Sequence, residues 1–260
     1  MNILFSILLI IILNNTFTEK DKGGTSYQET QNQEQRKIIY ADNPLFNGKD
    51  KFFNDWIMVD SKHFIFHFPS NSIVKNKDQF INNHEQAYAK LNSFLETSLP
   101  QKFNYFVWNY SYEAEKFGIG VLSFALPELC LVHVHAAESI GHEMTHLLTY
   151  YLPGSTGIKT KFINEGIATY FDLNNRSVYG GPGFKKPNEK ISLIKAWEND
   201  YIYSDYVYYF LGAEVIKLLN QKFGKDKLIR LIENQSYKNA LNIYGKELTK
   251  VIEEVENKIN

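Results

Sequence analysis

The sequence predicts an α+β protein in which a small lobe built on a mixed sheet is followed by a mainly helical lobe. Short segments rich in aromatic and β-branched residues lie between residues 63 and 135, as is typical of strands. From residue 204 onward, aliphatic residues recur at spacings of three and four, which favours amphipathic helices. One longer segment with the same helical spacing, Lys77–Thr97, falls among the strands, and we expect it to cover the sheet.

Composition supports a single folded domain or two closely packed lobes. We place this folded part at residues 41–260. Of 260 residues, 44% are hydrophobic and 15% aromatic, enough to bury a large core. The 28 basic and 29 acidic side chains leave a net charge of −1, so charge gives no reason to expect nucleic acid or an anionic membrane as a partner. A single cysteine, Cys130, excludes an intramolecular disulfide and zinc sites of the Cys₄ or Cys₂His₂ type.

The start of the chain predicts export. Residues Ile3–Leu13 are apolar apart from Ser6, too short a run for an easy membrane span of about 20 residues but typical of a secretory signal. We therefore predict a signal peptide over residues 1–18 and a secreted or cell-envelope protein, with an uncleaved membrane anchor as the alternative. Residues Glu19–Lys37 contain one aromatic and no aliphatic residue, which predicts a disordered linker over residues 19–40.

The first lobe is predicted from its strand patterns. The strands expected before the central motif are His63–Phe68, Phe103–Tyr110, Gly120–Ala125 and Leu129–His135, with a turn at Pro127 joining the last two. Within the last of these, His133 and His135 alternate with valine and share one strand face. They could contact a substrate or a second ion, although a half-exposed strand with polar residues facing a cleft or solvent is the commoner arrangement.

The central motif is H-E-x-x-H, formed by His142, Glu143 and His146. On a helix, residues four apart lie on one face, so the two histidines can bind one zinc ion. Glu143 is rotated by about 100° from His142, which sets its carboxylate beside the metal, where it could take a proton from a zinc-bound water. Ser139 is a plausible N-cap and Pro153–Gly154 a stop signal, so we expect both histidines to lie in the middle of the helix.

A second helical segment, Phe162–Phe171, supplies a third ligand. Its carboxylate, Glu165, follows His146 after eighteen intervening residues, and a catalytic zinc site needs three protein ligands with a fourth position left for water. Thr169 lies four residues after Glu165 and could form a hydrogen bond with a zinc histidine, or it could equally be a residue of the helix with no such role. A helix that merely carries two histidines on one face is the alternative for the five-residue motif taken alone.

The last part of the chain predicts a turn-rich loop and then helices. Asn174–Pro187 contains several glycines and prolines and is a candidate specificity loop at the rim of the cleft. The predicted helices are Ser204–Lys222, Lys225–Glu233 and Leu241–Ile259.

These motifs resemble those of the gluzincin metallopeptidases, and most closely the bacterial peptidase MA-like families. H-E-M-T-H and the later N-E-G-I-A-T-Y, which contains Glu165, match the paired zinc motifs, the second of which typically reads E-G-x-A-x-Y. The segment Tyr208–Leu219 resembles the Y-x-x-G-A helix of the aminopeptidase N relatives. There the tyrosine three residues before the glycine helps to hold the oxyanion, and the matching position is Tyr209. The resemblance covers roughly Ser61–Glu254.

The resemblance implies a gluzincin-like fold and zinc-dependent hydrolysis of a peptide or protein substrate. One Zn²⁺ would be held by His142, His146 and Glu165, with Glu143 as the base and Tyr209 at the oxyanion. A strand near the zinc helix, here Gly118–Ala125, would pair with extended substrate. The chain has no G-x-M-E-N segment of the kind with which aminopeptidases bind a free amino terminus, which favours an endopeptidase. The alternatives are a zinc-stabilised envelope binding protein without turnover and a zinc hydrolase of non-peptide substrates.

Overall fold

The computed structural model describes residues 56–116, 119, 122–173 and 190–259. The predicted signal peptide and linker, the loop Asn174–Pro187 and part of the segment Gly118–Ala125 lie outside the described residues. Within the described ranges, no helix is both long enough and apolar enough to traverse a bilayer.

A mixed sheet forms the first lobe and confirms the predicted α+β class. The described strands are β1 (Trp56–Asp60), β2 (Phe64–Pro69), β3 (Phe103–Trp108), β4 (Phe124–Leu126) and β5 (Leu131–His135), in the order β1-β2-β3-β5-β4. The inner strands β2, β3 and β5 run parallel, whereas β1 and β4 pair antiparallel at the two edges. The predicted turn between the last two strands is the short 3₁₀ turn η2 (Pro127–Leu129). β1 was not predicted, and most of its side chains are exposed or only partly buried.

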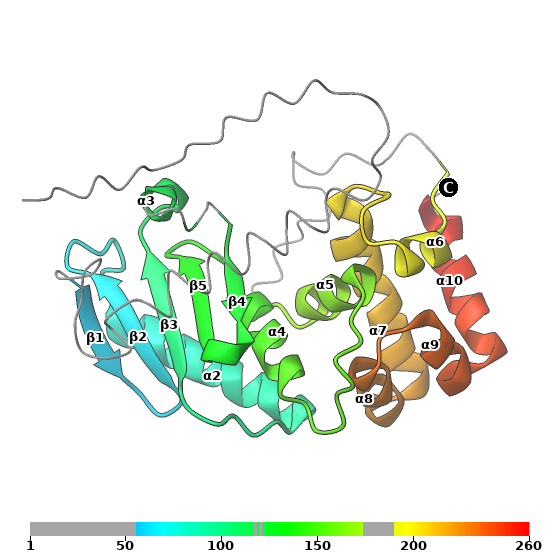
Figure 1. Ribbon diagram of the computed structural model, residues 1–260, viewed down its shortest axis with the longest axis horizontal. Coiled ribbons are helices and arrows are strands. Elements are labelled where there is room, and N and C mark those ends of the chain that lie inside the picture. Colours follow the sequence, from blue (N-terminus) through cyan, green and yellow to red (C-terminus); the bar gives the residue numbers. More distant parts are fainter. Residues whose placement is uncertain (1–55, 117–118, 120–121, 174–189, 260) are drawn as a thin grey trace, which may run out of the picture.

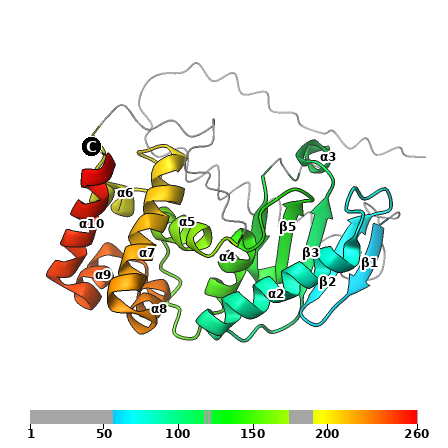
Figure 2. The same cartoon turned by 180° about the vertical axis from the view of Figure 1, so that it is seen from behind.

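Alternation along β2 explains how the sheet is covered. Phe64, Phe66 and Phe68 point to one face and are fully buried, as the two-residue period of a strand requires. The helix α2 (Lys77–Leu95) packs over that face, as Figure 2 shows from behind the sheet. Its predicted extent is confirmed apart from the last turn, because the chain leaves the helix at Glu96 with a φ of 53°.

The motif helix α4 (His142–Tyr150) lies beside α2 and against β4 and β5 (Figure 1). The prediction that both histidines lie in mid-helix is wrong, because His142 is the first residue of the helix. Gly141 precedes it with a φ of 121°, a conformation that glycine adopts readily and other residues avoid. The carbonyl of Gly141 accepts hydrogen bonds from the amide and the hydroxyl of Thr145. Gly141 rather than the predicted Ser139 therefore occupies the N-cap.

The second lobe is helical, as predicted, but two of its helix boundaries differ from the prediction. The predicted helix Ser204–Lys222 consists of a π-helical turn and then an α-helix, and the predicted Leu241–Ile259 is two helices divided at Gly245, whose φ is 58°. The elements of this lobe are α5 (Lys161–Tyr170), α6 (Leu193–Glu198), η3 (Val207–Leu211), α7 (Gly212–Phe223), α8 (Lys225–Glu233), α9 (Tyr237–Tyr244) and α10 (Lys246–Ile259). A continuous cluster of buried apolar side chains extends from the phenylalanines of β2 to α10.

Two glycines let α5 cross the start of α7 at backbone contact. A Cβ on Gly166 would lie 2.6 Å from the carbonyl carbon of Gly212, and a Cβ on Gly212 would lie 2.5 Å from the carbonyl oxygen of Phe162. Neither helix can accept a side chain here without moving, since both obstacles are backbone atoms. The crossing fixes Glu165, which precedes Gly166, relative to Tyr209 in η3.

Replacing Gly212 with alanine is expected to destabilise the protein by about 1–3 kcal/mol, the usual cost of overpacking a tightly packed interior. The free energy of unfolding from chemical denaturation measures this. The matched control is Gln221→Ala on the exposed face of the same helix, which should change stability by less than about 0.5 kcal/mol. Equal stability of Gly212→Ala and the control would show that the crossing tolerates a side chain.

Candidate metal centre

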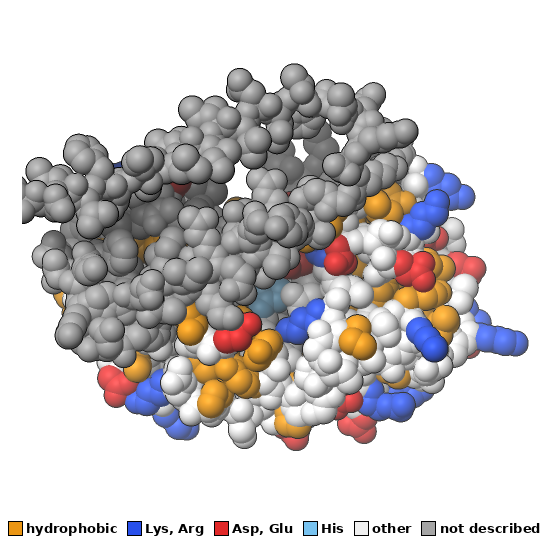
Figure 3. Space-filling view, viewed as in Figure 1, with side chains coloured by type: hydrophobic (Ala, Val, Ile, Leu, Met, Phe, Trp, Pro, Cys, Tyr) orange, Lys and Arg blue, Asp and Glu red, His pale blue; other side chains and the backbone are white. Residues whose placement is uncertain are grey.

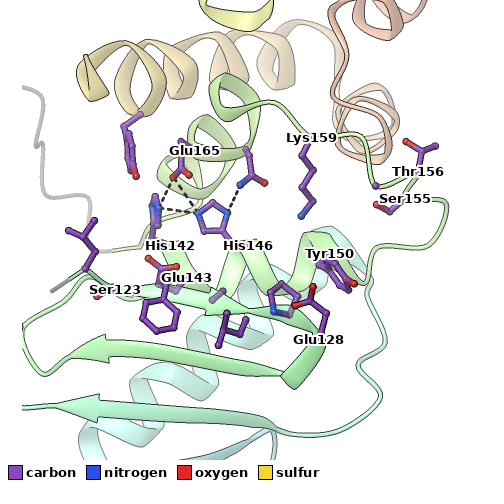
Figure 4. Close-up of a pocket in the computed structure, with 18 residues that line it drawn as sticks. Ser123, Glu128, His142, Glu143, His146, Tyr150, Ser155, Thr156, Lys159 and Glu165 are labelled. Carbon is purple, nitrogen blue, oxygen red and sulfur yellow. Dashed lines mark hydrogen bonds and ion pairs between the residues drawn. The ribbon is translucent and has the colours of Figure 1, made fainter. Parts of the chain in front are cut away.

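Three side chains from α4 and α5 converge on one point. Nε2 of His142 lies 3.2 Å from Oε2 of Glu165, Nε2 of His146 lies 3.3 Å from the same oxygen, and the two nitrogens are 3.3 Å apart. A tetrahedral zinc ion with bonds of about 2.0–2.1 Å separates its ligand atoms by about 3.3–3.4 Å. The nearly equilateral triangle therefore has the dimensions of a zinc site, and these residues could hold a metal ion. Figure 4 shows the three groups facing one another.

The charge state of Glu165 suits a metal ligand. Burial alone would raise the pKa of this carboxyl, but the adjacent His146 and His142 lower it by more, so its pKa lies well below the ordinary value. A carboxylate that stays ionised is the form that binds a metal. The donor set of two imidazole nitrogens and one carboxylate oxygen is one that catalytic zinc sites use.

Asn164, which sequence reasoning missed, supports His146 from behind. Its side-chain amide lies 3.0 Å from Nδ1 of His146. When Nε2 of a histidine binds a metal, Nδ1 carries the proton. The Nδ1–H of His146 can then donate a hydrogen bond to Oδ1 of Asn164 once the amide is rotated by half a turn. The predicted role of Thr169 is wrong, because its buried hydroxyl has no hydrogen-bond partner among the described residues. The available signal for Asn164 was its place immediately before Glu165.

Asn164→Ala is expected to weaken zinc binding by about 10- to 100-fold, the usual effect of removing a group that orients a metal-binding histidine. Competition with a chromophoric chelator measures the dissociation constant. Asn164→Asp keeps an acceptor at the same place and should bind zinc at least as tightly as the wild type. An unchanged affinity in Asn164→Ala would show that His146 needs no such support.

Glu143 lies next to the triangle without belonging to it. It follows His142 in the first turn of α4, its side chain lines the cleft, and its residue exposure is 9%. In Figure 4 its carboxylate lies on the side of His142 that faces the sheet and Ser123. Glu143 is therefore not one of the three groups that could hold a metal ion.

The three neighbouring tyrosines of the second lobe occupy different environments. Tyr209 lines the cleft, and its ring stacks on that of His142 with centroids 5.6 Å apart. Burial, and then the nearby carboxylates of Glu165 and Glu143, raise the pKa of Tyr209, so its hydroxyl keeps the proton and can donate it in a hydrogen bond. Tyr208 is fully buried and donates to the carbonyl of Asn199. Tyr206 packs near Phe210 and is not among the described residues that line the cleft.

The candidate metal centre lies in a cleft of about 720 Å³ between the two lobes. Residues from Leu122 to Glu128, which include all of β4, form one wall. β5 is the only neighbour of β4 among the described strands, so no described strand pairs with the outer edge of β4 at this wall. Figure 3 shows histidine surface in the middle of the described part of this face, with a basic side chain beside it in that view. The cleft can therefore accept an extended chain along β4 and past the metal centre.

Neither His133 nor His135 belongs to the triangle or to the described residues that line the cleft. His133 is fully buried on β5, and its ring stacks on Phe124 with centroids 4.6 Å apart. Nδ1 of His135 lies 3.4 Å from Glu138. The expectation of a half-exposed strand is therefore wrong at His133, because the aromatic residues of β3 and β4 cover that face. The single cysteine, Cys130, is buried.

Comparison with known proteins adds no assignment to this geometry. No protein-family model matches the chain. No curated protein matches it either.

Proposed function

We propose that the protein is a zinc-dependent endopeptidase. The observation that carries this proposal is the triangle of His142, His146 and Glu165, with Glu143 beside it and the edge of β4 along the same cleft. A site that only stabilises the fold needs ligands but neither a base nor an accessible strand edge. The likeness of both sequence motifs to those of the gluzincin peptidases points to the same class.

The residues of the cleft supply the groups that hydrolysis of an amide requires. Zinc in this centre would act as a Lewis acid that polarises a carbonyl and lowers the pKa of water. Glu143 accepts the proton of the attacking water and passes it to the nitrogen of the leaving amine. The hydroxyl of Tyr209 donates a hydrogen bond to the carbonyl oxygen as negative charge develops on it.

The shape of the cleft favours an extended backbone as the substrate. A peptide that adds to β4 as a further strand exchanges backbone hydrogen bonds with it, and these bonds do not depend on the side chains of the peptide. The peptide then lies between β4 and the metal centre, on the side where Glu143 is placed (Figure 4). This arrangement brings an internal peptide bond to the base without any need for a free terminus.

Digestion of a mixed peptide library by the purified protein tests the proposal. We expect cleavage within the peptides that stops when a zinc chelator is added and returns when zinc is restored. The Glu143→Gln variant, purified in the same way, controls for contaminating proteases. Zinc binding without cleavage of any peptide would favour a zinc-stabilised binding protein. Cleavage of esters or other non-peptide substrates alone would favour a zinc hydrolase of non-peptide substrates.

A further inference from the structure

A lysine from the loop between α4 and α5 lines the same cleft. The side chain of Lys159 is half-buried and extends toward the cleft next to Tyr150 and Glu128, on the His146 side of the metal centre (Figure 4). Ser123 and Glu143 lie toward the opposite end of the cleft in the same view. Lys159 therefore lies beside the path of a chain that runs along β4, away from the catalytic base.

The position of Lys159 is fixed by the fold on both sides. The carbonyl of the preceding Ile158 accepts a hydrogen bond of 3.0 Å from the amide of Gln235, and the amide of the following Thr160 donates one of 3.1 Å to the side chain of Gln235. Gln235 is fully buried between α8 and α9. The loop is thus attached to the helical lobe immediately before and after Lys159, and only its side chain is left to point into the cleft.

The ammonium group of Lys159 has no anionic partner within ion-pair distance among the described residues. It lies 5.5 Å from the centre of the Tyr150 ring, while Glu128 and Glu165 act on it only through longer-range electrostatics. Burial lowers the pKa of Lys159, which means that the charged form has lost part of its hydration. By contrast, the ammonium of the nearby Lys161 lies 3.2 Å from a carboxylate oxygen of Asp205.

A partly dehydrated cation that faces a binding cleft is matched best by an anion carried on the ligand, because a charge-assisted hydrogen bond replaces the lost hydration. We propose that Lys159 is a specificity-determining residue that selects peptides with a carboxylate side chain, aspartate or glutamate, near the bond to be cleaved. This inference rests on the proposed peptidase function and names its substrate class. The structural alternative is a lysine that covers Tyr150 with its aliphatic stem and binds nothing.

Paired peptides test the inference. The probes are N-acetylated, C-amidated peptides that differ only in Glu or Gln at one position, with that position moved along the peptide. We expect the wild type to cleave the best Glu peptide with a kcat/KM about 10- to 100-fold above that of its Gln partner, as for a hydrogen bond between charged groups. Lys159→Met, which keeps the aliphatic stem, should bring the ratio to about 1 through loss of the Glu peptide alone. Lys159→Glu should reverse the preference toward a lysine peptide.

Two further variants sharpen the test. Lys161→Met removes a neighbouring lysine whose ammonium is paired with Asp205 and should leave the ratio unchanged. Glu128→Gln removes the carboxylate that attracts Lys159 at longer range and should increase the preference for Glu. A wild-type ratio near 1, or a preference that survives in Lys159→Met, would overturn the inference.

Binding separates this inference from the proposed function. The same Glu and Gln peptides are titrated into the Glu143→Gln protein, in which turnover is expected to be lower by about 100-fold or more, and their dissociation constants are compared with and without Lys159→Met. Selective binding of the Glu peptide that depends on Lys159, without hydrolysis by the wild type, would support the subsite and contradict the peptidase. If the wild type hydrolyses the Glu and Gln peptides equally well and the protein binds them equally tightly, the proposed peptidase function stands and the role of Lys159 is overturned.

Discussion

Glu143→Gln is expected to lower the turnover of peptide substrates by about 100-fold or more while the protein keeps its zinc. A glutamine has nearly the size of the glutamate and can still form hydrogen bonds, but it has no basic carboxylate to accept a proton, and general acid–base catalysis usually contributes about 10²- to 10⁴-fold. Turnover of a cleaved library peptide gives the rate, and metal analysis of the same sample gives the zinc content. Turnover and zinc content together show whether Glu143 acts as a base or as a metal ligand.

Two results would contradict the predicted role of Glu143. An active Glu143→Gln variant would contradict the role of Glu143 as the base. Loss of both zinc and activity would instead make Glu143 part of the metal site, although its carboxylate lies outside the triangle formed by His142, His146 and Glu165. Glu138→Gln is the matched control, since this carboxylate is bound by Ser123 and His135 instead of facing the metal centre.

Tyr209→Phe is expected to lower kcat by roughly 100-fold with little change in KM. The substitution removes the hydroxyl, together with its hydrogen bond to Glu165, and keeps the ring that stacks on His142, so it tests the hydrogen bond made to the developing oxyanion. Loss of one such donor typically costs about 10²- to 10³-fold in kcat, and removing an interaction made only in the transition state lowers kcat and kcat/KM equally. Steady-state kinetics on one peptide measures both constants.

The neighbouring tyrosines are the controls. Tyr206→Phe should leave kcat near the wild-type value, because Tyr206 is not among the described residues at the cleft. Tyr208→Phe should lower stability rather than kcat, because its hydroxyl bonds the backbone of Asn199, Ile202 and Tyr203. A large loss in Tyr206→Phe with an active Tyr209→Phe would transfer the role to Tyr206.

The candidate metal ligands could be predicted from sequence because their spacing is local. Two histidines one helical turn apart can face one ion in any helix, and Glu165 lies on a segment with clear helical periodicity. The start of α4 could not be predicted in the same way, since it depends on the positive φ of Gly141. The positions of Asn164 and Lys159 could not be predicted, because they depend on the packing of α5 against α4 and on hydrogen bonds to Gln235, which lies far along the chain.

In the fold, too, elements set by local sequence could be predicted, whereas elements set by contacts between distant segments could not. Strands with buried aromatic faces, such as β2 and β3, can be predicted from their composition and from the alternation of their side chains. β1 could not be predicted in this way, because its side chains are exposed or only partly buried and its place is decided by pairing with β2. The last predicted helix is divided where Gly245 ends α9 with a φ of 58°. A π-helical turn precedes Gly212, which packs against the backbone of α5. Hydrophobic periodicity records neither feature.

Zinc content tests the central claim most directly. Metal analysis of the purified, dialysed protein should find one zinc ion per chain in the wild type and almost none in His146→Ala, which removes one corner of the triangle. His63→Ala is the matched control, since His63 pairs with Glu85 and its loss should leave the zinc in place. A wild-type protein without stoichiometric zinc, or a His146→Ala protein that keeps all of it, would contradict the metal centre and the proposed function with it.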